Sequence, residues 1–150
     1  MRDPLIAYLS IVSGEAGSQT GGLLVTNPQG RPLEFHCTEP VTPNQAQRIL
    51  YGQTLDEFLV GDLIAPTLVG KMKAQPALVV CDAMACLGAR SQGVVTFPML
   101  ALLSHEVRAR RPQLIEFQLQ SHPVAISGAC PEDQGIAEHA ATAIANWCEL

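Results

Sequence analysis

The feature that most constrains the fold is the stretch Gly21–Thr38, in which two strand-like runs flank the sequence Asn-Pro-Gln-Gly at positions 27–30. Asparagine opens a turn, proline presets the backbone of the second position, and glycine supplies the left-handed residue of a type I turn with a G1 bulge. The two runs are therefore predicted to pair as an antiparallel hairpin.

The second run of this hairpin alternates between apolar and polar side chains. One face of it is expected to lie in the core, and the other to meet water or a ligand. The expected core face carries Leu33, Phe35 and Cys37, and the polar face carries Glu34, His36 and Thr38. If the chain has a pocket, we expect it on this polar face, near the end of the later strand that finishes at Asp82.

Two helices are predicted after the hairpin. The first is short, with Thr42 as its N-cap, proline at its first position, and a buried stripe of apolar residues. The second begins with a capping box from Thr54 to Glu57, and its apolar residues recur with a helical period. Pro66 is expected to kink or stop this second helix. The buried stripe of the first helix comprises Ala46, Ile49 and Leu50. The apolar face of the second helix comprises Leu55, Phe58, Leu59, Leu63, Ile64 and Leu68.

The remaining elements complete an α/β pattern. An apolar run before the hairpin is expected to add a third antiparallel strand, and a continuous apolar run that ends in an acid reads as a parallel strand buried on both faces. The predicted class is therefore α/β, with a three-stranded antiparallel meander extended by a parallel strand, helices packed on the sheet, and a single domain over residues 1–150. The elements are strands at 5–12, 77–82, 94–97, 114–119 and 124–127, and helices at 83–90 and from 131 to the C-terminus. Residues 100–110 fit either a helix or a strand, and we favour the helix.

Bulk properties limit the classes of protein to be considered. The 150 residues fit one domain, and no stretch has the roughly 18 apolar residues of a membrane span. The N-terminus lacks a signal-peptide core and the five cysteines are an odd, dispersed set, so reduced thiols and a cytoplasmic location are expected. The net charge of −5 lacks the basic footprint of nucleic-acid binding, so nucleic acid is not expected as a partner.

The order of three antiparallel strands, helical crossover, buried strand, helix, strand and final helix resembles the ribonuclease-H-like fold. In active members of that fold, metal-binding carboxylates gather at the ends of central strands, so the resemblance implies such places for Glu57, Asp82 and Asp133. The first strand has Ser10 where a further acid belongs, so the acidic set is incomplete. The part from the hairpin through the second helix is also similar to uncharacterised small bacterial proteins, which implies no activity.

Two functions from different classes follow. The first is a non-catalytic interaction or regulatory module without a cofactor, in which Asp82, Glu57 and Asp133 only cap or support helices. The alternative is a divergent metal-dependent hydrolase or nuclease that uses Mg²⁺ or Mn²⁺. Its candidate catalytic residues are Glu34, His36, Glu57, Asp82 and Asp133, of which Asp82 and Asp133 are the candidate metal ligands.

A thiol or imidazole metal site is not favoured by the spacing. His36 and Cys37 are neighbours on a strand and point to opposite faces, and four residues separate Cys81 from Cys86, which is looser than a zinc knuckle. Because free cysteine is among the most buried residue types, Cys37 is expected in the core.

Composition also predicts self-association, most simply as a two-fold homodimer, with a further protein partner allowed. Charged residues make up 15% of the chain, against about 25% in typical domains, and the mean hydropathy is +0.18. The apolar stretch 94–103 exceeds the needs of one strand facing one core, so part of it is expected to be buried against a second copy.

Overall fold

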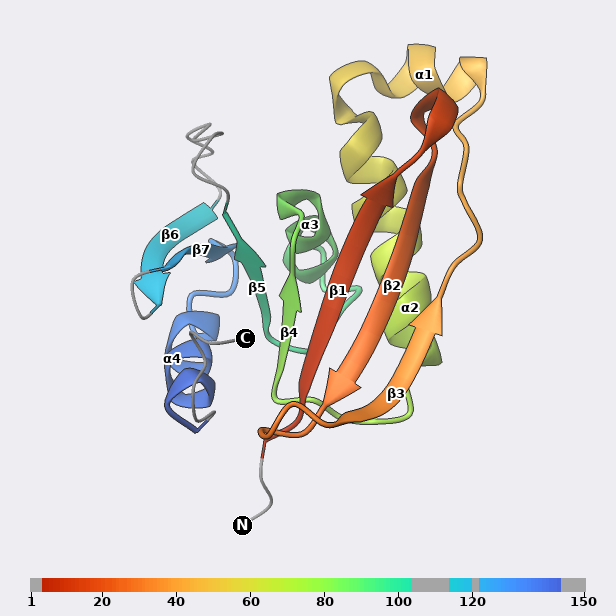
Figure 1. Cartoon of the computed structure of the whole chain (residues 1–150). Helices are drawn as coiled ribbons and strands as arrows, with labels where there is room; N and C mark the ends of the chain where they lie inside the picture. Colours follow the sequence, from red (N-terminus) through yellow and green to blue (C-terminus); the bar gives the residue numbers. More distant parts are fainter. Residues whose placement is uncertain (1–3, 104–113, 120–121, 144–150) are drawn as a thin grey trace.

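The computed structural model describes residues 4–103, 114–119 and 122–143, which form a seven-stranded mixed sheet with helices on both faces (Figure 1). The strand order is β3-β2-β1-β4-β5-β7-β6. The strands are β1 (Ile6–Ser13), β2 (Gln19–Thr26), β3 (Pro32–Cys37), β4 (Leu78–Cys81), β5 (Met99–Leu102), β6 (Leu114–Leu119) and β7 (His122–Ser127).

The predicted meander and parallel extension are confirmed. β1, β2 and β3 pair antiparallel in sequence order, while β4 lies parallel to β1 on its other side and β5 lies parallel to β4. The hairpin turn is also as predicted: Gly30 has a φ of 83° and donates its amide to the carbonyl of Asn27 at 2.9 Å. The chemistry of the turn therefore sets the start of the sheet.

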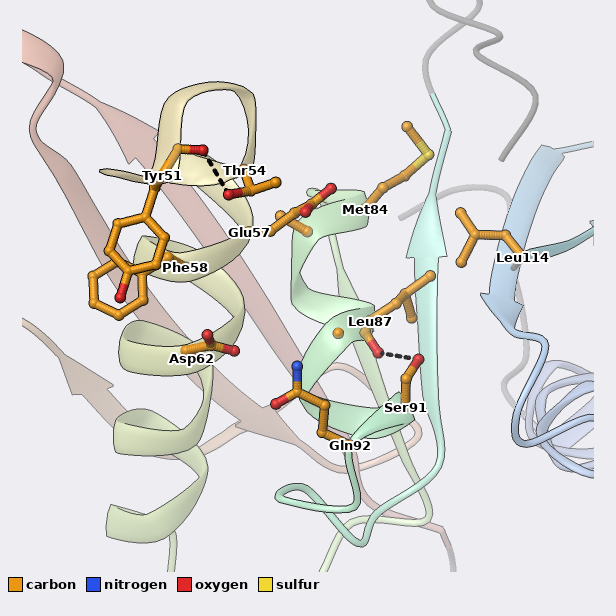
Figure 2. A pocket seen from close by; sticks show the side chains of 12 residues that line it. Tyr51, Thr54, Glu57, Phe58, Asp62, Met84, Leu87, Ser91, Gln92 and Leu114 are labelled. Atoms are coloured by element: carbon orange, nitrogen blue, oxygen red, sulfur yellow. Dashed lines mark hydrogen bonds between the residues drawn. The ribbon is translucent and has the colours of Figure 1, made fainter. Parts of the chain in front are cut away.

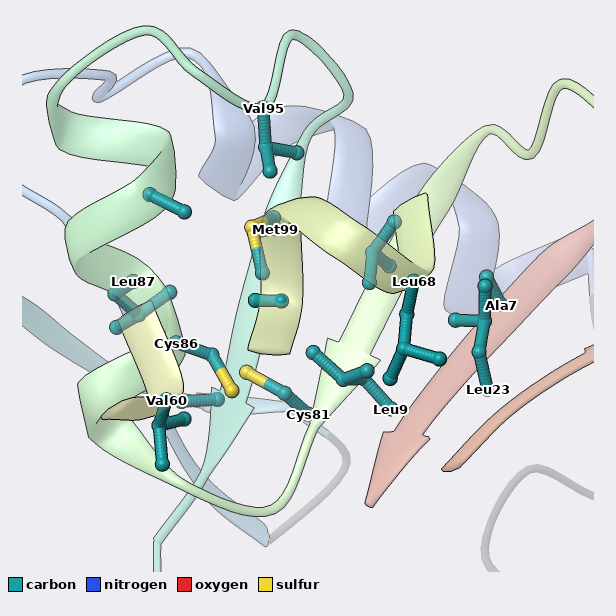
Figure 3. Close-up of a cluster of buried hydrophobic side chains, with 14 of the residues drawn as sticks. Ala7, Leu9, Leu23, Val60, Leu68, Cys81, Cys86, Leu87, Val95 and Met99 are labelled. Atoms are coloured by element: carbon teal, nitrogen blue, oxygen red, sulfur yellow. The ribbon is translucent and has the colours of Figure 1, made fainter. Parts of the chain in front are cut away.

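The helices cover the sheet unequally. The π-helical segment Glu57–Ile64, α2 (Ala65–Lys71) and α3 (Leu87–Ser91) pack on one face of the central strands, whereas α4 (Asp133–Ala143) packs on the other face, over β4 to β7. Figure 3 shows the core of the first face, in which Leu9, Leu23 and Leu68 belong to one buried cluster with Leu87 of α3 and Met99 of β5. None of the described helices is long and apolar enough to cross a membrane.

The two faces of β3 are the reverse of the prediction. Leu33 and Phe35 are 53% and 64% exposed and Cys37 is exposed too, whereas Glu34 and His36 are half-buried. The reason is that Glu34 accepts the backbone amides of Lys73 and Ala74, at 2.9 and 3.0 Å, and thereby ties the edge strand to the loop after α2. An alternating strand shows two faces but does not say which is covered.

Both helix starts differ from their predictions. Helix α1 (Gln45–Tyr51) has Asn44 as its N-cap, in a capping box with Gln47, so the start lies two residues beyond the predicted Thr42. None of its residues is buried, so the expected core stripe is wrong: Ile49 is 73% and Leu50 80% exposed. Thr54 does not cap a new helix, because its hydroxyl donates to the carbonyl of Tyr51 and helical winding continues past it.

The predicted interruption at Pro66 takes the form of a change in winding. The π-helical segment Glu57–Ile64 gives way to the α-helix α2 directly before the proline, and the amide of Ala65 bonds to the carbonyl of Val60, five residues back. Wider π spacing upstream accommodates a residue that has no amide to donate. The helical rod continues through the proline to Lys71.

The strand expected at residues 94–97 lies five residues later, as β5. The segment from Leu100 therefore starts as a strand, which is the alternative, and the favoured helix is wrong at its start. Its later part, like the predicted face at residues 144–148, lies outside the described residues. Four apolar residues of the stretch 94–103 are internal, since Val95, Met99, Leu100 and Ala101 are at most 1% exposed, whereas Val94 and Leu102 are 58% and 42% exposed. The predicted strands at 114–119 and 124–127 and the helix after residue 131 are confirmed.

Candidate active site

Asp82 follows the last residue of β4, at the edge of the sheet where the parallel strands β1 and β4 end. Its carboxylate is held by the first strand: Ser10 Oγ donates to Oδ2 at 2.7 Å, and the amide of Ile11 donates to Oδ1 at 3.0 Å. The side chain is nevertheless exposed. Asp82 is thus a fixed, solvent-facing carboxylate.

Asp56 and Glu57 share a pocket with Asp82. This pocket has a volume of about 340 Å³ and lies between the end of β1, the start of the π-helical segment and the loop after β4. We name it the carboxylate pocket. It is lined by Ile11, Ser13, Gln19, Gln53, Asp56, Glu57, Val60, Asp82, Ala83, Met84 and Ala85.

A close approach of backbone to backbone holds together two of the elements that line the carboxylate pocket. A Cβ at Gly61 would lie 2.7 Å from the carbonyl oxygen of Ala85, so only glycine allows the π-helical segment to pack this closely on the turn that follows Asp82. This contact fixes the element that carries Glu57 against the element that carries Asp82.

A second pocket of about 340 Å³ continues from the first along the groove between the π-helical segment and α3. The two share Glu57, Met84 and Ala85. We name the second one the aromatic pocket, because the rings of Tyr51 and Phe58 stack at its edge with centroids 4.1 Å apart and planes at 10° (Figure 2).

Glu34 and His36 lie elsewhere, and neither lines the carboxylate pocket or the aromatic pocket. The imidazole Nε2 of His36 lies 2.5 Å from Glu34 Oε2, so the two are partners. The amide of Lys73 lowers the pKa of Glu34 most, and hydrogen bonds from His36 and from the amide of Ala74 add to this. The pair fastens β3 to the loop after α2.

Asp133 is also apart from the carboxylate pocket. It is fully buried and forms a bidentate pair with Arg90, with Nε to Oδ2 and Nη2 to Oδ1 both at 2.9 Å. The amide of Met99 also donates to it, at 3.3 Å. The hydrogen bond to Asp133 raises the pKa of Arg90. Asp133 therefore joins α4, α3 and β5 and is not solvent-facing.

Of the five predicted site residues, the structure brings Glu57 and Asp82 into one pocket, and it adds Asp56, which sequence reasoning missed. The signal was present, since Asp56 precedes Glu57, but a capping-box interpretation gave it no role. Within residues 4–103, 114–119 and 122–143, no three side chains of histidine, cysteine, aspartate or glutamate are grouped so that they could hold a metal ion.

Two cysteines, Cys81 and Cys86, are buried and belong to the core of the first face of the sheet. Cys37, Cys81, Cys86 and Cys130 are free thiols, and Cys81 and Cys86 point toward each other in Figure 3. The contact with Cys86, together with burial, raises the pKa of Cys81 well above its ordinary value. A thiol held neutral in this way is a poor metal ligand or nucleophile.

No protein-family model and no curated protein matches the chain. Among solved structures it is similar to endonuclease V from Ciona intestinalis in complex with a 24mer DNA containing an inosine followed by a ribo-adenosine, with 10% identity, a TM-score of 0.43, and coverage of 85% of this chain and 72% of that one. It is also similar to Argonaute from Marinitoga piezophila with a 5′ OH guide RNA, with 8% identity, a TM-score of 0.37, and coverage of 82% and 22%.

These comparisons correct two predictions. Both proteins hold nucleic acid and the first is an endonuclease, which contradicts the prediction of a non-catalytic module and the prediction that nucleic acid is not a partner. A net charge describes the whole surface, and a cation bound at an acidic site can reverse the charge locally, so net charge alone does not exclude a nucleic-acid partner. The roles assigned to residues below rest on this chain's own geometry.

Proposed function

We propose that the chain is a divalent-cation-dependent hydrolase that cleaves phosphodiester bonds of nucleic acid at the carboxylate pocket. The observation that carries this proposal is that Asp82, Glu57 and Asp56 line one solvent-open pocket. Asp82 and Glu57 come from elements far apart in the sequence. Neither is buried in a structural ion pair, as Asp133 is.

The position of the pocket supports the proposal. The chain leaves β1 toward β2 on one side and leaves β4 toward β5 on the other, so the strand order changes direction between β1 and β4. In open α/β sheets, ligands bind outside the carboxyl ends of strands at such a change of direction. Asp82 lies at this place.

The donor set fits Mg²⁺ or Mn²⁺ in one specific way. Mg²⁺ is usually held by one or two carboxylates, several waters and the phosphates of the substrate, not by a full protein cage. Asp82 and Glu57, with Asp56 on the same wall, would supply that minimal set. When bound, the cation would supply Lewis-acid polarisation of the phosphodiester and a more acidic water. We therefore propose that it binds together with the substrate.

The residues of the chain would divide the remaining work. Ser10 and the amide of Ile11 orient the carboxylate of Asp82 through both of its oxygens. Gly61 keeps the π-helical segment close enough for Glu57 to face the same space. Glu34 and Asp133 would act only through the stability of the sheet and of α4.

The test is a cleavage assay with fluorescein-labelled single- and double-stranded DNA and RNA in Mg²⁺, Mn²⁺ or EDTA. We expect cation-dependent cleavage of at least one substrate, and a loss of about 100-fold or more in Asp82→Asn and Glu57→Gln, because the cation's contribution is several kcal/mol. The matched control is Glu39→Gln, an exposed acid outside both pockets. Cleavage by Asp82→Asn at the wild-type rate, or no cation-dependent cleavage of any substrate, contradicts the proposal.

We also propose that the chain self-associates through β3 and not through residues 94–103. The argument is the exposed apolar face of β3, with Leu33, Phe35 and Cys37, on a strand at the edge of the sheet. An edge strand with apolar side chains is a ready surface for a second copy.

A further inference from the structure

We propose that the aromatic pocket binds a guanine base of the nucleic-acid substrate. This inference deepens the proposed function, on which it rests, by naming the part of the substrate that the groove beside the carboxylate pocket would hold. It depends on residues that cleavage itself does not need.

The aromatic pair supplies the stacking surface. Tyr51 and Phe58 come from the end of α1 and from the π-helical segment, and both line the aromatic pocket. Their parallel rings brace each other, and both residues are half-buried, so they offer a preordered π surface. Every base has a π face, so this contact gives affinity for bases of any kind.

The polar groups of the groove give the selectivity. Figure 2 shows Asp62, on the π-helical segment, and Gln92, at the end of α3, on opposite walls of the groove. Among the described residues, neither side chain has a hydrogen-bond partner. A carboxylate accepts hydrogen bonds and cannot donate them, so Asp62 favours a base edge that presents two adjacent N–H donors.

Guanine fits this requirement and adenine does not. The Watson–Crick edge of guanine carries the N1–H and the N2 amino group, both donors, beside the O6 acceptor, which the amide of Gln92 could meet. Adenine presents an acceptor at N1, which would face the carboxylate of Asp62 without a hydrogen bond. A polar site of this kind rejects the wrong partner because an unpaired polar group is costly.

The charge of the groove agrees with a base and not with a phosphate. Within residues 4–103, 114–119 and 122–143, the side chains that line the aromatic pocket and the carboxylate pocket include no lysine or arginine, and they include four acids: Asp56, Glu57, Asp62 and Asp82. The base therefore lies in the aromatic pocket, and the phosphate would lie beside Asp82, where a cation offsets the negative charge. The shared residues Glu57, Met84 and Ala85 make the two pockets continuous.

The experiment follows guanosine and adenosine binding by NMR with ¹⁵N-labelled protein in EDTA, so that neither metal nor phosphate takes part. We expect guanosine to bind at least about fivefold more tightly than adenosine and to shift the side-chain amide signals of Gln92. In Asp62→Asn the affinities for guanosine and adenosine should differ by less than about twofold. In Tyr51→Leu both should weaken by about fivefold or more.

The controls are Glu39→Gln and Phe35→Leu, an exposed acid and an exposed aromatic residue outside the pocket, which should leave both affinities unchanged. Equal affinities for the two nucleosides, a preference that survives Asp62→Asn, or tighter binding of the organic cation putrescine than of guanosine overturns the inference. Circular dichroism and thermal melting confirm that each variant folds.

The result of the guanosine-binding test can be distinguished from the result of the cleavage assay. Asp82→Asn should keep guanosine binding while it loses cleavage. Asp82-dependent cleavage without guanosine selectivity would overturn only the base-binding inference. Guanosine selectivity without cleavage would overturn only the proposed hydrolase activity.

Discussion

The hydroxyl of Ser10 donates to Oδ2 of Asp82 across the parallel pair β1 and β4, at 2.7 Å. The residue that stands where the ribonuclease-H-like resemblance implies an acid therefore supports the acid on the neighbouring strand. A carboxylate in its place would face Asp82 at hydrogen-bond distance. The incomplete acidic set is thus open to a direct test by a single substitution.

Ser10→Asp should raise the affinity for Mn²⁺ by about tenfold or more, because it adds a carboxylate to a site that has few ligands. Without metal, the repulsion of two adjacent carboxylates should lower the melting temperature, and Mn²⁺ should restore it. Isothermal titration and thermal melting with and without Mn²⁺ check both effects. Ser10→Asn is the control of similar size, and equal Mn²⁺ affinity in both variants would show that position 10 is not beside a cation site.

Asp133→Ala should lower the free energy of unfolding by about 3–5 kcal/mol, because it removes both carboxylate contacts from the largely buried guanidinium of Arg90, which keeps the Thr96 carbonyl and the exposed Glu132 nearby. Urea denaturation followed by circular dichroism measures the change. Glu132→Gln is the matched control: Glu132 is 62% exposed and lies 3.7 Å from the same guanidinium, so its loss should cost less than about 1 kcal/mol. Equal costs would mean that Asp133 does not hold α4 to α3 and β5.

Glu34 should make stability depend on pH in the acid range. Its folded-state pKa is lowered from the ordinary value of 4.5, so the ionised carboxylate stabilises the fold above that value. This stabilisation should be lost as the pH falls from about 4.5 through the lower folded-state pKa. Urea midpoints measured from pH 6 to pH 3 should fall more steeply in the wild type than in Glu34→Gln, and Glu39→Gln should follow the wild type.

Gly61→Ala should destabilise the protein by about 1–3 kcal/mol, because the new methyl group would press on the carbonyl of Ala85. The displaced turn carries Met84 and Ala85, so cleavage and guanosine binding should decline with it. Gly70→Ala, in α2, is the control: nothing lies within 4 Å of its added methyl group, and it should be neutral or stabilising by up to about 1 kcal/mol.

Light scattering behind a sizing column at tens of micromolar should give twice the mass of 16.0 kDa for the wild type. Phe35→Glu should return it to the monomer mass, because the charge lies on the exposed apolar face of β3. Val94→Glu, an exposed position in the segment that composition first indicated, should stay dimeric. A wild-type mass of 16.0 kDa that does not change with concentration contradicts self-association.

The sequence predicts the order and direction of the central strands because turn chemistry and long apolar runs act locally. It does not predict which face of β3 is covered, since that depends on the amides of Lys73 and Ala74, some 40 residues away. The shift of the α1 cap from Thr42 to Asn44 has a similar origin, because both side chains can cap a helix and neighbouring contacts decide between them.

For the same reason, the candidate site could be predicted from the sequence only in part. Glu57, Asp82 and Asp133 are named from their places in the ribonuclease-H-like order, but that order does not show that the partner of Asp133 is Arg90 on another helix. The aromatic pocket could not be foreseen, because it requires the end of α1, the π-helical segment and α3 to be placed against one another.

The π-helical winding from Glu57 to Ile64 determines how far the residues before it are rotated about the helix axis relative to α2. The C-terminal part of this continuous helix is fixed against the sheet. Ile64 and Leu68 pack so closely on β2 that a Cβ at Gly21 would lie 2.3 Å from Ile64. Deleting one residue from the segment would let it rewind as an α-helix and would turn everything upstream by about 100°. The core below would keep its packing, while Asp56 and Glu57 would rotate away from Asp82. The direction in which these acids point is thus encoded in a hydrogen-bond spacing and not in any side chain of the pocket.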